Sequence, residues 1–314
     1  MKYISPKPLK KGARLAIIAP ASPFNPEQLY AGIQTLNKCG MEVVMGDNTF
    51  FLRHNNLYAA NLSQRIEEFR WAIEDDSIDG IICATGGFGS AQLLPHLPYN
   101  IIAQKRKPIM GFSDITALNT AILSKSGLIN FNGPTASILT DDKNDATALE
   151  DAINLLMNTD FWGNQPFVRN KTLPQCVSAG KSSGPAIGGN LSTFTHLLGT
   201  PYFPNVEGAI LFMEDIHESS SNVVMYFQQL ALAGIFDKLA GIVIGTFTQR
   251  PEKLDPIEPS IEQIIVEYLK DGPPCIYGLN FSHNPICAII PIGTHCIVDA
   301  NKLQVMFDSP FDNI

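Results

Sequence analysis

The first half of the chain alternates short apolar segments with segments of helical periodicity, and this alternation restricts the fold more than any other feature. The apolar segments are short enough to be strands and lie at 14–19, 41–45, 81–84, 108–112 and 128–132. Short strands without a polar face are typical of a parallel sheet that is covered on both sides. The sequence therefore predicts an α/β domain with such a sheet in residues 1–160.

The segments between these strands carry helix signals. Asn25 followed by Pro26 predicts a helix start, because asparagine caps a first turn and proline fits the first helical position. That helix is expected to end at Gly40. A second helix places its apolar side chains on one face, namely Leu62, Ile66, Phe69 and Ile73. Further helices are expected at 114–124 and 146–157.

The pattern changes near residue 160, which suits a chain of 314 residues because that length predicts about two domains. Residues 158–185 are rich in proline and glycine and have little periodicity, so 161–185 is predicted to be a linker or crossover. Helices are then expected at 190–198, 222–233 and 260–269, and strands at 209–213, 242–246, 275–280, 288–291, 295–299 and 303–307. The closely spaced final strands predict a β-rich α+β domain, antiparallel or barrel-like, over 186–314.

Charge and hydropathy exclude several classes of partner. The net charge is −8 and no long Lys/Arg block occurs, which excludes a nucleic-acid or anionic-membrane partner. The one basic concentration, at Lys7, Lys10, Lys11 and Arg14, is interpreted as a solvated N-terminal face. No apolar run reaches the ~18 residues of a spanning helix. Because the apolar run at 15–19 suits a first strand better than a signal peptide, we expect a cytoplasmic protein.

The cysteines and histidines are not expected to form a metal site. None of the six cysteines belongs to a CxxC pair, and several lie in apolar runs, so buried, reduced thiols are expected at Cys39, Cys83, Cys176, Cys275, Cys287 and Cys296. His217 has acidic neighbours but no second histidine at helical spacing. We therefore expect no metal, no cofactor and no disulfide scaffold.

Two turns directly after predicted strands are candidate sites, because ligands of open α/β sheets bind beyond the carboxyl ends of the strands. The first is Thr85-Gly86-Gly87-Phe88-Gly89-Ser90, whose glycines can point backbone N–H groups at an anion or oxyanion. It lacks the third glycine of a dinucleotide fingerprint and the lysine of a phosphate loop.

The second turn, Gly111-Phe112-Ser113-Asp114-Ile115, resembles a nucleophile elbow, in which a tight strand-to-helix turn exposes a serine hydroxyl. The alternative is that Ser113 only caps the following helix. A nucleophilic serine needs a base and an acid that orients the base. His283, in a polar turn, is the candidate base and His295 the competitor. Glu214, at the end of an apolar strand, is the candidate acid and Asp215 the alternative.

An ordered set of motifs is similar to those of the LD-carboxypeptidase family of serine peptidases, which includes murein tetrapeptide carboxypeptidases and microcin C self-immunity proteins. The resemblance spans residues 12–293. It rests on Ile18-Ala19-Pro20-Ala21-Ser22-Pro23, Gly86-Gly87-Phe88-Gly89-Ser90, Gly111-Phe112-Ser113-Asp114-Ile115-Thr116, Gly188-Gly189-Asn190-Leu191-Ser192, Gly199-Thr200-Pro201-Tyr202, Leu211-Phe212-Met213-Glu214-Asp215, Ser282-His283-Asn284-Pro285 and Pro291-Ile292-Gly293.

The resemblance implies a catalytic triad of Ser113, Glu214 and His283, with the backbone N–H groups of Gly87 and Asp114 as the oxyanion hole. It implies an N-terminal domain like flavodoxin or class I amidotransferases, a β-rich C-terminal domain, and an active site between the two. The implied activity releases terminal D-Ala from muropeptide tetrapeptides in peptidoglycan recycling, without cofactor, in a homodimer.

Some positions depart from the family pattern. Thr85 stands where the family usually has arginine, and Ser282 where it has glycine. Ser221, Val224 and Met225 stand where it tends toward a tyrosine and an Asp-Arg pair. Since these changes leave the triad intact, they concern the substrate more than the chemistry. Two alternatives stay open: an amidohydrolase of aminoacyl-nucleotide conjugates with the same triad, and a non-catalytic peptide- or sugar-binding protein.

Overall fold

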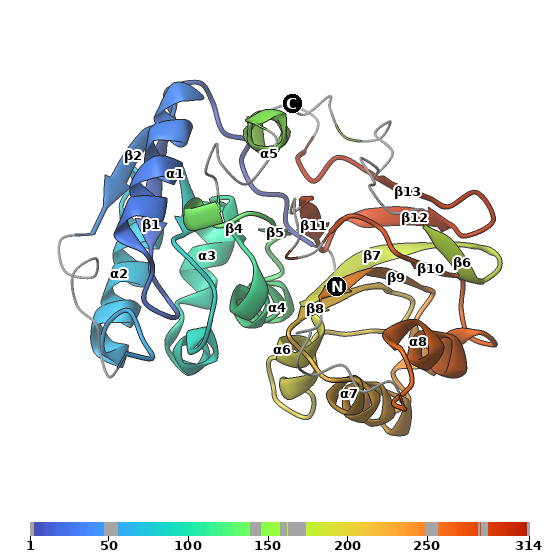
Figure 1. The fold of residues 1–314 in the computed structure, drawn as a ribbon. Helices are drawn as coiled ribbons and strands as arrows, with labels where there is room; N and C mark the ends of the chain where they lie inside the picture. Colours follow the sequence, from blue (N-terminus) through green and yellow to red (C-terminus); the bar gives the residue numbers. More distant parts are fainter. Residues whose placement is uncertain are drawn as a thin grey trace.

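The structure, a computed structural model, contains two β-sheets with helices around them (Figure 1). It describes residues 3–46, 56–138, 146–157, 162, 174–248, 257–281, 283 and 288–312. Within these residues no helix combines the length and hydropathy that crossing a membrane requires.

The first sheet has the strand order β11-β5-β4-β3-β1-β2, in which β11 is Ile290–Ile292. The strands taken from the first half of the chain are parallel to one another: β1 (Arg14–Ile18), β2 (Glu42–Met45), β3 (Gly80–Cys83), β4 (Ile109–Gly111) and β5 (Asn130–Asn132). Helices α1 (Pro26–Lys38) and α5 (Ala146–Met157) pack on one face. Helices α2 (Leu62–Glu74), α3 (Tyr99–Lys105) and α4 (Thr116–Ser126) pack on the other. The predicted parallel sheet with cover on both faces is confirmed.

The predicted start of α1 is confirmed in its details. The Asn25 side chain accepts a hydrogen bond from the Glu27 N–H, and Pro26 occupies the first helical position. Helix α2 begins with a capping box between Asn61 and Gln64, in which each side chain bonds the other residue's backbone N–H. These local signals fix the two helices at defined positions along the sheet.

The second sheet has the order β13-β12-β7-β8-β9-β10-β6. Its strands are β6 (Gln175–Ser178), β7 (Lys181–Asn190), β8 (Ile210–Ile216), β9 (Gly241–Thr248), β10 (Cys275–Tyr277), β12 (His295–Asp299) and β13 (Gln304–Phe307). The four central strands β7 to β10 are parallel, whereas β6, β12 and β13 pair antiparallel. Helices α6 (Leu191–His196), α7 (Ser220–Leu232) and α8 (Ile261–Leu269) lie on one side of this sheet (Figure 1). The antiparallel arrangement expected for the final strands is confirmed for β12 and β13, whereas β10 pairs parallel with β9 and antiparallel with β6.

The described end of the predicted linker or crossover, 174–185, contributes β6 and half of β7. Glycine and proline suggest a loop here, but Gly184 lies within β7. Glycine is needed at this position because the backbone just before β8 approaches it closely. A Cβ at this position would lie 2.0 Å from the Gly208 carbonyl oxygen. Residues 158–161 and 163–173 lie outside the described residues, and the division of the chain into domains stays a prediction.

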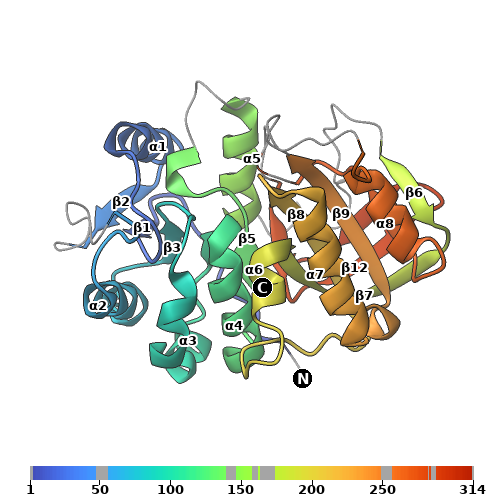
Figure 2. The ribbon, with the colours of Figure 1, turned by 60° about the horizontal axis from the view of Figure 1, so that its bottom comes forward.

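Strand β11 (Ile290–Ile292) joins the two halves of the chain. It was expected to belong to the C-terminal unit, but it pairs antiparallel with β5 at the edge of the first sheet. Helices α4 and α6 lie side by side where the two halves meet (Figures 1 and 2). The N–H of Asn190 donates to Thr116 Oγ1 across this junction at 2.9 Å. The start of α4, just after the serine turn, is thereby held against the second sheet.

The cysteines follow the prediction in part. Cys83, Cys275 and Cys296 are buried free thiols, whereas Cys39 is half-buried. Cys176 is exposed, because it lies on the edge strand β6. Cys287 lies outside the described residues. Burial raises the pKa of the three buried thiols far above the ordinary value, so these thiols stay protonated at neutral pH.

Candidate active site

Ser113 lies in a tight turn between β4 and the short helix η2 (Ser113–Ile115), which leads into α4. Its φ is +64°, in the left-handed region that costs a non-glycine residue about 1–2 kcal/mol. Ser113 is the first residue of η2, and the residue at the N-cap position is Phe112, so Ser113 does not occupy the N-cap of this helix. A strained serine between a strand and a helix has the geometry of a nucleophile elbow.

The glycine turn that follows β3 packs directly against this elbow. A Cβ at Gly86 would lie 2.8 Å from the Ser113 Cβ, so only glycine lets the two turns approach this closely. Gly87 has a φ of +101°, which suits glycine. Ser22 Oγ holds the turn by accepting the Phe88 N–H at 2.9 Å and by donating to the Leu57 carbonyl oxygen at 3.0 Å.

Asp114 links the glycine turn to the elbow. Its carboxylate accepts the Ser90 N–H at 2.9 Å, and its backbone carbonyl oxygen accepts the Ser90 hydroxyl at 2.6 Å. Burial raises the pKa of Asp114, and the hydrogen bonds from Ser90 oppose this shift. Within the described part of the chain, the backbone N–H groups of Gly87 and Asp114 donate to no acceptor. Two rigid amides without a partner in these residues can receive a negatively charged oxygen.

Glu214 and His283 form a buried pair. The Glu214 side chain on β8 is 0% exposed, that of His283 is 14% exposed, and Glu214 Oε2 lies 2.8 Å from His283 Nδ1. The pairing of β8 with β9 shifts register between Met213 and Asp215, which interrupts the strict alternation of the strand. Burial raises the pKa of Glu214, and the hydrogen bond with His283 opposes this shift.

The imidazole of His283 lies against the serine elbow. Its ring centroid is 4.5 Å from that of Phe112, the residue before Ser113. Because Glu214 takes Nδ1, Nε2 is the ring nitrogen left to exchange a proton with a substrate or nucleophile. The structure thus brings together the turns that carry Gly87, Ser113 and Asp114 and the pair formed by Glu214 and His283.

The competing residues have other partners. His295 Nδ1 lies 3.0 Å from Asp308 Oδ2 in an exposed pair on β12 and the segment after β13. Asp215 is buried but accepts hydrogen bonds from Asn190 Nδ2 and the Ser192 N–H, each at 2.8 Å. His217 is exposed, and the described residues hold no group of three potential metal ligands.

Asn190 was not predicted as a site residue, although it belongs to one of the motifs above. Its Nδ2 donates to Asp215 at 2.8 Å and to Glu214 Oε1 at 3.3 Å. Its Oδ1 accepts the Thr193 N–H and so caps α6. An asparagine before a helix is ordinarily explained as an N-cap. This explanation accounts for its side-chain oxygen but not for the amide nitrogen, which donates to the two carboxylates. Asn190 fixes the buried carboxylates and the start of α6 at once.

Arg65 on α2 was missed as well. Its side chain is 1% exposed, and its guanidinium donates to the carbonyl oxygens of Pro20 (2.8 Å), Gly89 (2.9 Å) and Ala60 (3.2 Å). It also lies 4.7 Å from the centroid of the Tyr58 ring. One feature of the sequence indicates that Arg65 is buried: it stands four residues before the core residue Phe69 on the same helix. Arg65 joins the turn after β1, the start of α2 and the glycine turn.

Replacing Arg65 by methionine is expected to lower the free energy of unfolding by about 2–5 kcal/mol, because buried carbonyl groups lose their donors. Urea unfolding followed by circular dichroism measures the change. The matched control is Arg70→Met, an exposed arginine on the same helix, with an expected change within about 0.5 kcal/mol. Equal stability of the two variants would contradict the bridging role of Arg65.

The positions that depart from the family pattern are partly visible. Thr85 is half-buried beside the glycine turn, and Ser282 lies outside the described residues. Ser221, Val224 and Met225 all lie on α7, where Met225 is exposed. The expected cationic and acidic side chains are thus replaced by small or apolar ones on this helix.

Comparison with known proteins agrees with this fold. The chain matches the LD-carboxypeptidase N-terminal domain over residues 15–133 and the LD-carboxypeptidase C-terminal domain over residues 183–298. It is 32% identical over 311 residues to the probable murein peptide carboxypeptidase of Bacillus subtilis. That alignment covers 96% of this chain and 93% of the relative. It is 28% identical over 305 residues to the murein tetrapeptide carboxypeptidase of Pseudomonas aeruginosa, covering 93% and 94%.

A solved structure shares the whole fold. The microcin C7 self-immunity protein MccF, in the apo state of an inactive mutant, matches with a TM-score of 0.87 and 25% identity over 98% of this chain and all of that one. The two-sheet fold and these matches define a serine-type peptidase. The chain belongs to the LD-carboxypeptidase family and is a serine-type LD-carboxypeptidase. The resemblance inferred from the sequence motifs and the predicted fold class are confirmed.

Proposed function

We propose that this carboxypeptidase hydrolyses the amide bond between the L-centre of the third residue of a cell-wall tetrapeptide, diaminopimelate or lysine, and the terminal D-Ala. The names of the Bacillus and Pseudomonas relatives support a murein peptide as the substrate. The product is a tripeptide and free D-alanine, which fits a role in peptidoglycan recycling. The observation that carries the chemistry is the His283–Glu214 hydrogen bond beside the Ser113 elbow.

Each of the proposed triad residues has one role. Ser113 Oγ attacks the scissile carbonyl carbon while His283 Nε2 takes its proton, and the protonated imidazole then gives that proton to the leaving amine. Glu214 holds the imidazole through Nδ1 and stabilises its cationic form. Water attacks the resulting acyl-enzyme by the same route in reverse, which regenerates Ser113.

The oxyanion of each tetrahedral intermediate is proposed to lie between the N–H groups of Gly87 and Asp114. The hydrogen bonds from Ser90 to Asp114 and the contact of Gly86 with Ser113 keep these amides in place before substrate binds. Preorganised donors of this kind contribute about 3–4 kcal/mol each to transition-state stabilisation. This explains why the two turns are packed so tightly.

Incubation of the enzyme with a purified muropeptide tetrapeptide is expected to release one alanine, seen by mass spectrometry as loss of a single residue from the carboxyl end. The stereochemistry of the released alanine, read by chiral derivatisation, is expected to be D. A tetrapeptide ending in L-Ala is the matched control and should stay intact. An unchanged tetrapeptide under conditions where an active-site fluorophosphonate labels Ser113 would contradict the substrate and leave the serine chemistry standing.

The second candidate substrate is an aminoacyl-nucleotide conjugate, favoured by the structural match to the microcin C7 self-immunity protein. An aminoacyl sulfamoyl adenosine tests it, because its cleavage with an intact tetrapeptide would reverse the order of the two candidates. Membership of a peptidase family argues against the third hypothesis, a non-catalytic binding protein. The homodimer and the cytoplasmic location stay predictions, and sedimentation analysis tests the first of them.

A further inference from the structure

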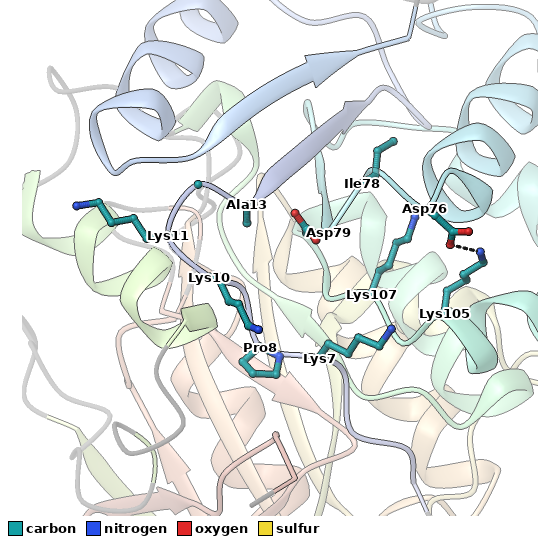
Figure 3. A pocket seen from close by; sticks show the side chains of 11 residues that line it. Lys7, Pro8, Lys10, Lys11, Ala13, Asp76, Ile78, Asp79, Lys105 and Lys107 are labelled. Atoms are coloured by element: carbon teal, nitrogen blue, oxygen red, sulfur yellow. Dashed lines mark hydrogen bonds and ion pairs between the residues drawn. The ribbon is translucent and has the colours of Figure 1, made fainter. Parts of the chain in front are cut away.

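A pocket of about 460 Å³ lies at the amino ends of the parallel strands of the first sheet (Figure 3). Its lining residues come from the segments just before β1, β3 and β4, so they lie at the amino ends of these parallel strands. Gly87 and Ser113 follow the carboxyl ends of β3 and β4. One strand length, about 10–15 Å at 3.3 Å per residue, therefore separates the pocket from the candidate active site.

The lining of this pocket is strongly basic. Five lysines and two aspartates line it, and because the Lys11 side chain points away, the other four lysines give an excess of two positive charges on a chain whose net charge is −8. The lysines are Lys7, Lys10, Lys11, Lys105 and Lys107, and the aspartates are Asp76 and Asp79. The N-terminal lysines, which the sequence alone suggests to be a solvated face, are thus joined in the fold by two more from before β4. Like charges gathered in a hollow create a local positive potential.

Two of the lysines are fixed by the protein itself. Lys105 forms an ion pair with Asp76. The Lys107 ammonium is buried and donates to the carbonyl oxygens of Ala72 at 2.9 Å and Asp75 at 2.6 Å. Burial, and next the Lys105 ammonium, lower the pKa of Lys107 to about 8, so this side chain is still mostly protonated at pH 7. The inner wall of the pocket therefore carries a fixed charge.

The other lysines are available to a ligand. Lys7 and Lys10 are exposed, and within the described residues their ammonium groups have no carboxylate partner. Figure 3 shows the Lys7 side chain extending in the direction of Lys105, whereas Lys11 points away from the pocket. Asp79 also lines the pocket, and its carboxylate already has a partner within the protein. Its Oδ2 accepts the Arg14 N–H at 2.8 Å.

The backbone that carries these lysines is anchored. The Lys7 N–H donates to the Arg106 carbonyl oxygen at 2.7 Å, and the Leu9 N–H donates to that of Leu156 at 2.9 Å. The Gly12 N–H donates to the Gly40 carbonyl oxygen at 2.8 Å. Three anchors within six residues hold this segment across the edge of the sheet. These hydrogen bonds restrict the segment, and a restricted segment lowers the entropic cost of binding a ligand.

We propose that this pocket binds a small anion of the phosphate-ester class, with Lys7 and Lys10 contacting the phosphate oxygens and Lys105 and Lys107 supplying the charge of the inner wall. A phosphate with two negative charges is favoured over a single carboxylate, since the attraction to the lysines grows with ligand charge and must exceed the repulsion by Asp76 and Asp79. The site is independent of the proposed peptidase reaction.

Titration of the full-length enzyme with inorganic pyrophosphate, by calorimetry at pH 7 and about 0.1 M salt, tests this site. One saturable site per chain is expected, with a dissociation constant below about 1 mM. The double variant Lys7→Ala/Lys10→Ala is expected to bind at least about tenfold more weakly, because two charged contacts are lost. Circular dichroism checks that this variant is folded, and Lys10→Glu is a second variant that changes one exposed side chain only.

The matched control is Lys238→Ala/Lys270→Ala, which removes the same charge from exposed positions in the second half of the chain. This control is expected to bind pyrophosphate within about twofold of the parent, because neither lysine lines the pocket. Absence of saturable binding would overturn the proposal. An equal loss in both double variants would also overturn it, since diffuse charge and not a built pocket would then hold the anion.

Discussion

Replacing Ser113 by alanine is expected to lower kcat for tetrapeptide hydrolysis by about 10⁴- to 10⁶-fold while the protein stays folded. The variant removes only the hydroxyl group, so the tight packing of the turn against Gly86 is kept. The residual rate is expected to come from substrate binding and from the proposed oxyanion hole formed by the amides of Gly87 and Asp114. Steady-state kinetics with release of alanine as the signal measures the loss.

The dependence of this loss on His283 sharpens the test. His283→Ala alone is expected to cost about as much as Ser113→Ala, and the double variant little more, because the two groups are proposed to act in the same proton transfer. Ser63→Ala, an exposed serine on α2, is the control and should leave kcat unchanged. Multiplying losses in the double variant would show that Ser113 and His283 act separately, and the triad proposal would then fail.

The local signals in the sequence predicted much of the fold because they depend on neighbouring residues alone. The Asn25-Pro26 start, the buried strands of the first sheet and the parallel arrangement all follow from patterns within about 15 residues. The position of β11 does not follow from such patterns. Its pairing with β5 joins residues about 160 positions apart, and a short apolar strand has no feature that selects its sheet.

The candidate site was predictable to the extent that its residues stand at turns after strands. Ser113 and the glycine turn could be located this way, and the structure adds the positive φ and the close packing that explain the turns. Arg65 and Asn190 could not be found in the same way. Each acts through hydrogen bonds to the backbone or to carboxylates far along the chain, and each has an ordinary local explanation as a helix residue or a cap.

Glu214 shows where the alternation rule for strands fails. A regular strand would turn Glu214 and Asp215 to opposite faces, which leaves open which of them meets the histidine. The register shift beside Glu214 allows both side chains to be buried, and hydrogen bonds then assign their roles. Asp215 accepts hydrogen bonds from Asn190 and from the Ser192 N–H at the start of α6, and Glu214 is hydrogen-bonded to His283. The choice depends on these tertiary contacts, which no sequence pattern specifies.

Replacing Glu214 by glutamine is expected to reduce kcat by about 10³- to 10⁴-fold, because a neutral amide neither selects the required imidazole tautomer nor stabilises its cation. The free energy of unfolding should change in the opposite sense, in favour of the variant. Burial raises the folded-state pKa of Glu214 above its ordinary value of 4.5, so the folded protein loses stability as the pH rises from 4.5 through that raised pKa. Glutamine has no such loss, and the stability of the variant relative to the parent should increase with pH over this window.

Urea unfolding at pH 4.5 and pH 7.5, together with kinetics at the higher pH, measures both effects in one pair of proteins. Asp308→Asn is the matched control, since it removes the acid from the other histidine pair, His295–Asp308, which is exposed and lies outside the site. Its kcat is expected to stay within about twofold of the parent, because an exposed ion pair contributes little. A Glu214→Gln enzyme within tenfold of the parent kcat would rule out Glu214 as the orienting acid. A loss of activity accompanied by an equal loss of stability at both pH values would assign Glu214 to the fold instead of to the reaction.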